Sequence, residues 1–221
     1  MHSARLPLVA GLATLCLVLA GCSSKVADTT QYSGFLPDYS KLKPSESPSG
    51  HQTLRWISPD DKLSDYRGIY YTPVVYYPAA KPNNRVSQAT LDQIRTYLDT
   101  QLKAAVAQRK PLVSQPEPGT LVMKTAITAV NAENQDMKFY EVVPVAAVVA
   151  STMAASGHRT QNSVLFLEAE LLDAKTGKPV MEVVRKAYGK TVANSSAPIN
   201  QAELKSAIDE MVRDVVALPA E

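Results

Sequence analysis

Cysteine is nearly absent from this 221-residue sequence. Its two cysteines, Cys16 and Cys22, lie close to the N-terminus, so the rest of the chain can form no disulfide and carries no thiol nucleophile. Histidine is almost as scarce, since only His51 and His158 follow residue 22. Neither has the cysteine or histidine neighbours that a zinc site would need. We therefore expect no metal site, and a domain that packing alone holds together.

The motifs of well-known enzyme classes are missing too. The sequence has no Gly-x-Ser-x-Gly nucleophile elbow, no His-Glu-x-x-His zinc motif, no phosphate-binding loop and no dinucleotide fingerprint. Three aspartates, Asp60, Asp61 and Asp65, lack the central glycine and closing glutamate of a calcium loop, and turn formation explains them better. We assign no catalytic residue and no cofactor, which makes a hydrolase the least favoured function.

An excess of charge of one sign is lacking as well. Beyond Arg5 the chain carries 22 basic and 21 acidic residues, and the two signs are interspersed. Nucleic-acid binding needs a basic patch, so this distribution argues against a nucleic-acid partner. After residue 21, no apolar run reaches the roughly 20 residues that span a bilayer.

What the sequence does have is an export signal. Arg5 precedes an apolar run, Leu6–Ala20, which is too short for a spanning helix. The run leads into Leu19-Ala20-Gly21-Cys22, which has the pattern of a bacterial lipobox. Its two small residues let the backbone enter a peptidase cleft, and the thiol of Cys22 takes the diacylglycerol. The alternative is a plain secretory signal followed by an ordinary cysteine.

The lipobox divides the chain into a signal peptide (1–21), a lipidated flexible tether (22–50) and one periplasmic domain (51–221). Ser23 stands where an aspartate would retain the protein in the inner membrane. We therefore expect the periplasmic face of the outer membrane, with acylated Cys22 as the membrane contact. The tether is rich in Ser, Thr, Pro and Lys, and could extend to about 80–100 Å. One apolar patch in it, 35–39, is able to dock on the domain.

Two helices are predicted in the domain from apolar residues at helical spacing. The first begins near Ser87 or Thr90, where Thr90 and Gln93 fit a capping box, and ends before Pro111. The second begins at Asn200, with Glu203 three residues later, and ends before Pro219.

Strands are expected where β-branched and aromatic residues gather. Their ranges are 53–58, 67–77, 120–130, 163–173 and 180–188. The second contains Pro73, which favours a sheet edge or a bulge. The last two form a hairpin through 174–178, in which Gly177 can take a positive φ. We expect Glu168 and Glu170 to lie opposite Arg185 and Lys186 across this hairpin.

These elements follow one another as β-β-α-β-(α)-β-β-α. That order implies an α+β fold with a single, mainly antiparallel sheet and helices packed on one of its faces.

The bracketed helix corresponds to an apolar segment, 142–157. Small residues recur in it every fourth position, at Ala146, Ala150 and Ala154. The segment is either a buried helix packed tightly on the sheet or a surface for self-association or membrane contact.

Four tyrosines come in two doublets, Tyr70–Tyr71 and Tyr76–Tyr77. In a strand, successive side chains point to opposite faces, so one member of each pair should be in the core and one outside. The outer pair is either ordinary sheet surface or a site for a protein or glycan partner.

Three stretches of the chain carry a resemblance to a known family. They are residues 35–42 (Phe-Leu-Pro-Asp-Tyr-Ser-Lys-Leu), residues 56–67 with Trp-x-Ser-Pro and Leu-Ser-Asp-Tyr-Arg, and residues 170–177. Over nearly all of its exported length the chain resembles the proteobacterial lipoproteins of domain-of-unknown-function family 3313. The Asp-x-x-Thr-Gly turn is also similar to one in the curli-secretion-channel lipoprotein and in lipoprotein activators of peptidoglycan synthases. That similarity implies an α+β domain that binds proteins or forms rings, and it supplies no catalytic residue.

Two functions remain. The first is a non-enzymatic structural, assembly or protein-binding module of the cell envelope, whose partner is another envelope protein or a second copy. The second is a module that binds a small ligand or glycan. A tyrosine-lined pocket would favour the second, and a flat apolar patch around 145–155 would favour the first.

Overall fold

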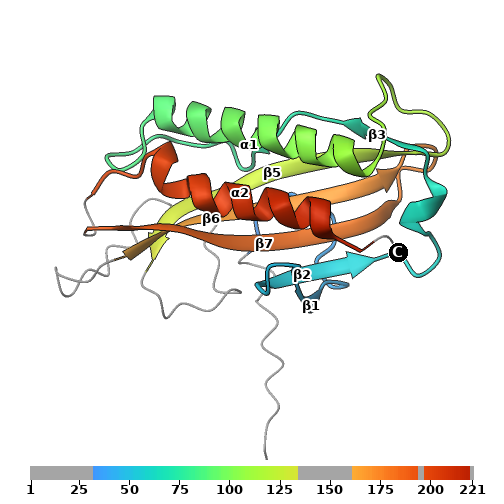
Figure 1. Cartoon of the computed structure of the whole chain (residues 1–221), viewed down its shortest axis with the longest axis horizontal. Coiled ribbons are helices and arrows are strands. Elements are labelled where there is room, and N and C mark those ends of the chain that lie inside the picture. The colour runs from blue at the N-terminus through green and yellow to red at the C-terminus, as the bar shows by residue number, and fades with distance from the viewer. Residues whose placement is uncertain (1–31, 134–160, 194–196, 220–221) are drawn as a thin grey trace, which may run out of the picture.

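The computed structural model describes residues 32–133, 161–193 and 197–219. In this part of the chain the strands form one sheet, and the two helices lie side by side over one of its faces (Figure 1). The elements are β1 (Lys43–Glu46), β2 (Gln52–Ile57), β3 (Gly68–Tyr71), β4 (Val75–Tyr76), α1 (Gln88–Arg109), β5 (Thr120–Glu133), β6 (Gln161–Asp173), β7 (Pro179–Val192) and α2 (Gln201–Ala217), with a single 3₁₀ turn at Leu63–Asp65.

The sheet has the order β1-β2-β7-β6-β5-β3, and β4 also pairs with β5. Every pairing is antiparallel except those of β3 and β4 with β5, which are parallel. The predicted α+β class, with a mainly antiparallel sheet and helices on one face, is therefore confirmed. The expected helix at 142–157 lies outside the described residues.

The strand predicted at 67–77 is divided in two. β3 and β4 are separated at Pro73, which has no N–H to donate to a ladder. Both parts lie beside β5 at the end of the sheet, so the predicted edge position is confirmed.

The β6–β7 hairpin forms as predicted, with φ of 69° at Gly177. Asp173 Oδ1 accepts hydrogen bonds from the N–H groups of Lys175 (3.0 Å) and Thr176 (2.6 Å), which fixes the turn.

The predicted cross-strand pairing in this hairpin is wrong. Glu170 lies opposite Glu182, and Glu168 lies opposite Val184. Because successive side chains alternate between faces, this register turns Arg185 away from both glutamates and toward the helices. Lys186 lies opposite Phe166 instead.

Local hydrogen bonds set where the helices start. Ser87 is the N-cap of α1, and its Oγ accepts from the Thr90 N–H at 3.1 Å, so the capping box predicted at Thr90 and Gln93 is wrong. α2 starts as predicted, since the Asn200 N–H donates to Glu203 Oε2 at 2.7 Å.

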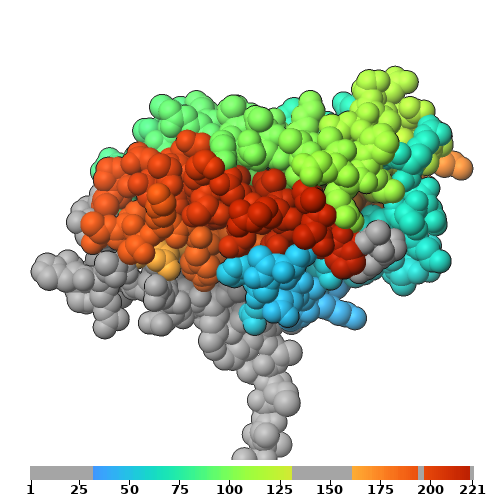
Figure 2. Space-filling model, in the orientation of Figure 1, coloured from blue at the N-terminus to red at the C-terminus, as the bar shows by residue number. Residues whose placement is uncertain are grey.

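Both helices bury their predicted apolar stripes against the sheet. Strand residues at alternate positions meet them, and together these side chains make the main core. The buried members on the helices are Leu91, Ile94, Leu98, Leu102, Val106, Leu204, Ile208 and Met211. Figure 2 shows α2 packed between α1 and the segment that holds β1 and β2.

The other face of the sheet is covered by residues 32–42, which we call the N-terminal strap. Leu36 and Leu42 are buried there against Val184, and the Tyr39 hydroxyl donates to Glu168 Oε2 at 2.5 Å. β1 then pairs with β2. The described part of the expected tether, 32–50, therefore packs on the domain, because the strap's apolar side chains gain a sheet face on which to bury.

Gly189 lies at a close contact between α2 and the sheet. A Cβ at this position would overlap the carbonyl oxygen of Glu203 in α2 and the hydroxyl of Ser163 in β6. We expect Gly189→Ala to lower the free energy of unfolding by about 2–3 kcal/mol, because backbone cannot yield as a side chain can. Urea unfolding measures the change. Gly119→Ala is the control, since φ there is 80° with open space around it, and it should cost about 1 kcal/mol. Equal losses would contradict the proposed overlap.

Candidate functional site

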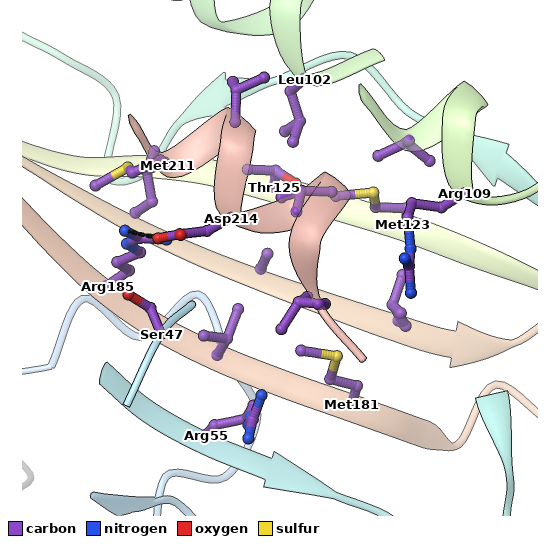
Figure 3. A pocket seen from close by; sticks show the side chains of 18 of the residues that line it. Ser47, Arg55, Leu102, Arg109, Met123, Thr125, Met181, Arg185, Met211 and Asp214 are labelled. Carbon is purple, nitrogen blue, oxygen red and sulfur yellow. Dashed lines mark ion pairs between the residues drawn. The ribbon is translucent and has the colours of Figure 1, made fainter. Parts of the chain in front are cut away.

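A cavity of about 270 Å³ lies between the two helices and the sheet. Figure 3 shows side chains from α1, α2, β2, β5 and β7 around this space. It lies toward the C-terminal ends of both helices, because residues 98–110 and 211–219 contribute to its walls.

The walls are mainly apolar. On the strands this follows from alternation, because every second residue of β5, β6 and β7 points toward the helices. The apolar lining includes Leu98, Leu102, Val106, Leu121, Met123, Leu167, Ala169, Leu171, Met181, Val183, Met211, Val212 and Val215. Three of these are methionines, whose unbranched side chains adapt to differently shaped contents.

A buried ion pair lines part of the cavity. Arg185 of β7 pairs with Asp214 of α2, and only 10% and 6% of these side chains are exposed. Ser49 Oγ donates to Asp214 Oδ2 at 2.7 Å. Burial pushes the pKa of Asp214 up, but the Ser49 hydrogen bond and the Arg185 charge outweigh it and hold this pKa below its usual value. Asp214 is therefore ionised at neutral pH and neutralises Arg185.

Two polar atoms along the cavity have no hydrogen-bond partner among the described residues. They are Oγ1 of Thr125 and Nε of Arg185, and both are buried. A buried polar atom without a partner costs about 1–3 kcal/mol. Both atoms therefore leave hydrogen-bonding capacity unused beside the cavity.

Three further basic residues line the cavity. Arg109 and Lys110, at the end of α1, and Arg55, on β2, all belong to the lining, and Arg109 is exposed. Arg109 Nη1 donates to the Val216 carbonyl (3.0 Å), and Lys110 Nζ donates to the Tyr66 carbonyl (2.6 Å). The side chain of Arg55 has no hydrogen bond or ion pair within the described residues, which leaves its guanidinium available to a ligand.

The opposite face of the sheet carries buried glutamates. Glu182 of β7 lies opposite Glu170 of β6, and Glu170 Oε1 is 3.1 Å from Lys124 Nζ. Glu182 is fully buried, and neither of its carboxylate oxygens has a hydrogen-bond partner among the described residues. The pKa of Glu182 is raised to about 7, mainly by burial; the charge of Lys41 lowers it, and the charges of Glu170 and Asp38 raise it.

The tyrosine doublets lie away from the cavity lining. Tyr71 and Tyr76 face the helices, where their hydroxyls donate to Asp99 Oδ1 (3.0 Å) and to the Leu91 carbonyl (2.8 Å). Tyr70 is half-buried outside that core, and Tyr77 is 41% exposed. The Tyr77 ring also meets the ring of Phe35 in the strap, with 5.7 Å between centroids.

Other residues singled out from the sequence have structural roles or lie outside the described residues. His51 is 47% exposed, and its Nε2 lies 3.0 Å from Glu210 Oε1 on α2. Asp61 accepts from Ser58 in a turn, at 2.8 Å. No group of three acidic, histidine or cysteine side chains is placed to hold a metal among the described residues. Outside them lie the lipobox with Cys22, the segment 142–157 with Ala146, Ala150 and Ala154, and His158.

The ion pair in the cavity lining was missed in the sequence, although a signal for it exists. Arg185 occupies an alternating position between Val183 and Ala187, where the neighbours on its face are apolar. Asp214 stands in the same way among the apolar residues of α2. A charged residue at a core-facing position on each of two elements predicts a buried pair.

The sequence matches the family described as "Protein of unknown function (DUF3313)" over residues 31–215. The chain belongs to this family. The resemblance seen in the sequence is thus confirmed. Among other members, the uncharacterized lipoprotein YdcL of Escherichia coli K12 is 46% identical over 207 residues, which cover 93% of each chain. The relative from Escherichia coli O157:H7 matches equally well.

Similarity to solved structures is weaker. The PelC dodecamer structure from Paraburkholderia phytofirmans matches with a TM-score of 0.34 and 12% identity, covering 74% of this chain and 98% of that one. Protein XCC0632 of Xanthomonas campestris, of family DUF330, matches with a TM-score of 0.37 and 10% identity, covering 72% and 87%. At these TM-scores and identities, neither match indicates a function for this chain. Within the described residues, neither helix has the length and apolarity needed to cross a membrane.

The raised pKa of Glu182 predicts how the stability of the protein depends on pH. Its usual value is 4.5, so the folded chain keeps a proton that the unfolded chain loses, and stability falls as pH rises from about 4.5 to 7. Glu182→Gln removes this effect. The variant should therefore gain stability relative to the parent chain over that range, by about 3 kcal/mol in total.

Urea unfolding between pH 4 and 8 measures the difference between the two proteins. Glu46→Gln, at an exposed position on β1, serves as the control and should give a flat difference. A flat difference for Glu182→Gln as well would contradict the prediction.

Proposed function

We propose that this chain is a membrane-anchored envelope lipoprotein that binds a small apolar ligand and catalyses no reaction. The observation that carries the proposal is the cavity of about 270 Å³ with its apolar walls. An apolar cavity of about 150 Å³ in another protein is large enough for benzene. The cavity here is thus large enough for a ligand of about twice that size.

The chemistry of the walls supports binding rather than catalysis. Nucleophilic catalysis needs a nucleophile beside a base. The hydroxyl of Thr125 has no hydrogen-bond partner among the described residues, and the Asp214 carboxylate is occupied by Arg185 and Ser49. The polar groups of the cavity are therefore suited to orienting a ligand.

The anchor is proposed on two grounds. The sequence Leu19-Ala20-Gly21-Cys22 has the lipobox pattern, and a relative with 46% identity is named a lipoprotein. With acylated Cys22 in the periplasmic face of the outer membrane, Tyr32, where the strap begins, is only ten positions further along the chain. Ten fully extended residue steps span at most about 33–36 Å. The domain would thus stay close to the bilayer, with the strap-covered face of the sheet tied toward it.

A second candidate function is the binding of another envelope protein or of a second copy. It is favoured by Val75 and Tyr77 at the edge of the sheet, which are 45% and 41% exposed. Exposed apolar side chains at a sheet edge are a common basis for pairing with another chain. Self-association through Ala146, Ala150 and Ala154 also stays a prediction.

Cys22→Ser tests the anchor. Without the thiol no diacylglycerol can be attached, so the variant should lose incorporation of radiolabelled palmitate and no longer appear in the outer-membrane fraction. Cys16→Ser, within the signal peptide, is the matched control and should leave both unchanged. Palmitate labelling of the Cys22 variant would overturn the assignment of this residue.

Ala169→Phe tests the cavity. Ala169 lines the cavity from β6, so a phenyl ring there would fill part of the space. Intact lipoprotein in phospholipid vesicles would be irradiated with a photoactivatable lauroyl probe, and labelled peptides identified by mass spectrometry. We expect labelling of peptides from β5, β6 and α2 to fall at least tenfold in the variant.

Ala107→Phe, at an exposed position on α1, is the matched control and should label like the parent chain. Circular dichroism checks that each variant is folded. Undiminished labelling of the β5, β6 and α2 peptides in a folded Ala169→Phe variant would contradict the proposal.

A further inference from the structure

The lining of the cavity combines an ion-paired cluster with further basic side chains. Arg185 is neutralised there by Asp214 and by Glu210, whose Oε1 lies 3.6 Å from the guanidinium. Arg55, Arg109 and Lys110 also belong to the lining, and Glu46 is the one exposed acidic residue in it. In Figure 3, Arg109 comes from the α1 side and Arg55 from the β2 side of the apolar space.

Arg55 is the basic residue of the lining whose side chain is most available to a ligand. Its side chain lies on the helix-facing side of β2, since Arg55 is directly opposite Val183, which lines the cavity. It is half-buried and makes no hydrogen bond or ion pair within the described residues. A guanidinium presents a planar fork of donors that matches a carboxylate or phosphate.

We propose that the ligand is an anionic single-chain amphiphile, whose acyl chain fills the cavity and whose carboxylate or phosphate binds Arg55 and Arg109. This rests on the proposed function, because it specifies the ligand of the same cavity. The volume is nearly twice that of the benzene-binding cavity, so it holds about ten to twelve carbons. A longer chain leaves its remaining carbons outside. The apolar walls favour an acyl chain, and the basic residues of the lining favour a negatively charged head group.

The carboxylate of a free fatty acid and the phosphate of a lysophospholipid share this chemistry. The competitors are therefore dodecanoate, lauroyl-lysophosphatidylglycerol and uncharged monolauroylglycerol, which carry the same chain. Each is added to intact lipoprotein in phosphatidylethanolamine vesicles, together with the photoactivatable lauroyl probe. The readout is labelling of cavity peptides.

We expect at least one anionic competitor to reduce labelling at a concentration about tenfold lower than monolauroylglycerol requires. Arg55→Ala should remove that advantage and leave competition by monolauroylglycerol unchanged. Arg213→Ala, on the exposed side of α2, is the matched control and should preserve it. Whichever anionic competitor is stronger identifies the source of the head group.

The failure of this inference can be told apart from the failure of the proposed function. If all three competitors act equally in the parent chain, or if Arg55→Ala keeps the anionic advantage, the cavity binds acyl chains without selecting charge and the inference is overturned. If no cavity peptide is labelled in the parent chain, the proposed function fails and the inference fails with it.

Discussion

The guanidinium of Arg185 lies beneath α2, and the position of the helix depends on how that charge is satisfied. An unpaired charge under a helix would cost several kcal/mol, so Asp214 and the Ser49 hydroxyl must stay in place beside it. Asp214 fixes the rotation and height of α2 over β7. Ser49 fixes the loop between β1 and β2, and His51 adds a contact to Glu210 from the same loop. One ion pair thus joins a strand, a helix and the segment that leads to the anchor.

This pair also accounts for the cavity. A hydrophobic pair of similar size could stabilise the domain equally well, so stability alone does not explain buried charge at this place. The pair holds the C-terminal half of α2 above β6 and β7, where apolar side chains from both layers meet around the space. It also adds a charged, paired group to the otherwise apolar walls. Arg55, Arg109 and Lys110 add basic groups elsewhere in the lining.

Alternation along the strands gives the two sheet faces different chemistry. On β7, Met181, Val183 and Arg185 point to the helices, while Glu182 and Val184 point to the strap. The helix-facing side is held by apolar packing and by the ion pairs of Arg185 with Asp214 and Glu210. The strap side contains Glu182 without a hydrogen-bond partner among the described residues, and this makes strap packing sensitive to protonation. We therefore expect the strap side of the sheet to be the one whose stability depends on pH.

Much of the local structure could be read from the sequence, because its signals act over a few residues. The Asn200–Glu203 start of α2, the stripes on both helices, and the turn at Gly177 depend on neighbours in the chain. The lipobox is likewise a local pattern. The register of the hairpin depends on matching two whole strands, and a difference of one residue reverses the face of every side chain.

Only the tertiary structure decided which distant residues meet. It placed Arg185 beside Asp214, the Tyr39 hydroxyl within hydrogen-bond distance of Glu168, and Glu182 in a fully buried position on the strap side. These contacts join residues far apart in sequence, and they form only when burial of apolar surface outweighs the entropy of bringing the segments together. The cavity belongs to the same class. Its apolar residues are ordinary core residues in the sequence, and the space between them arises from the way two helices rest on one sheet.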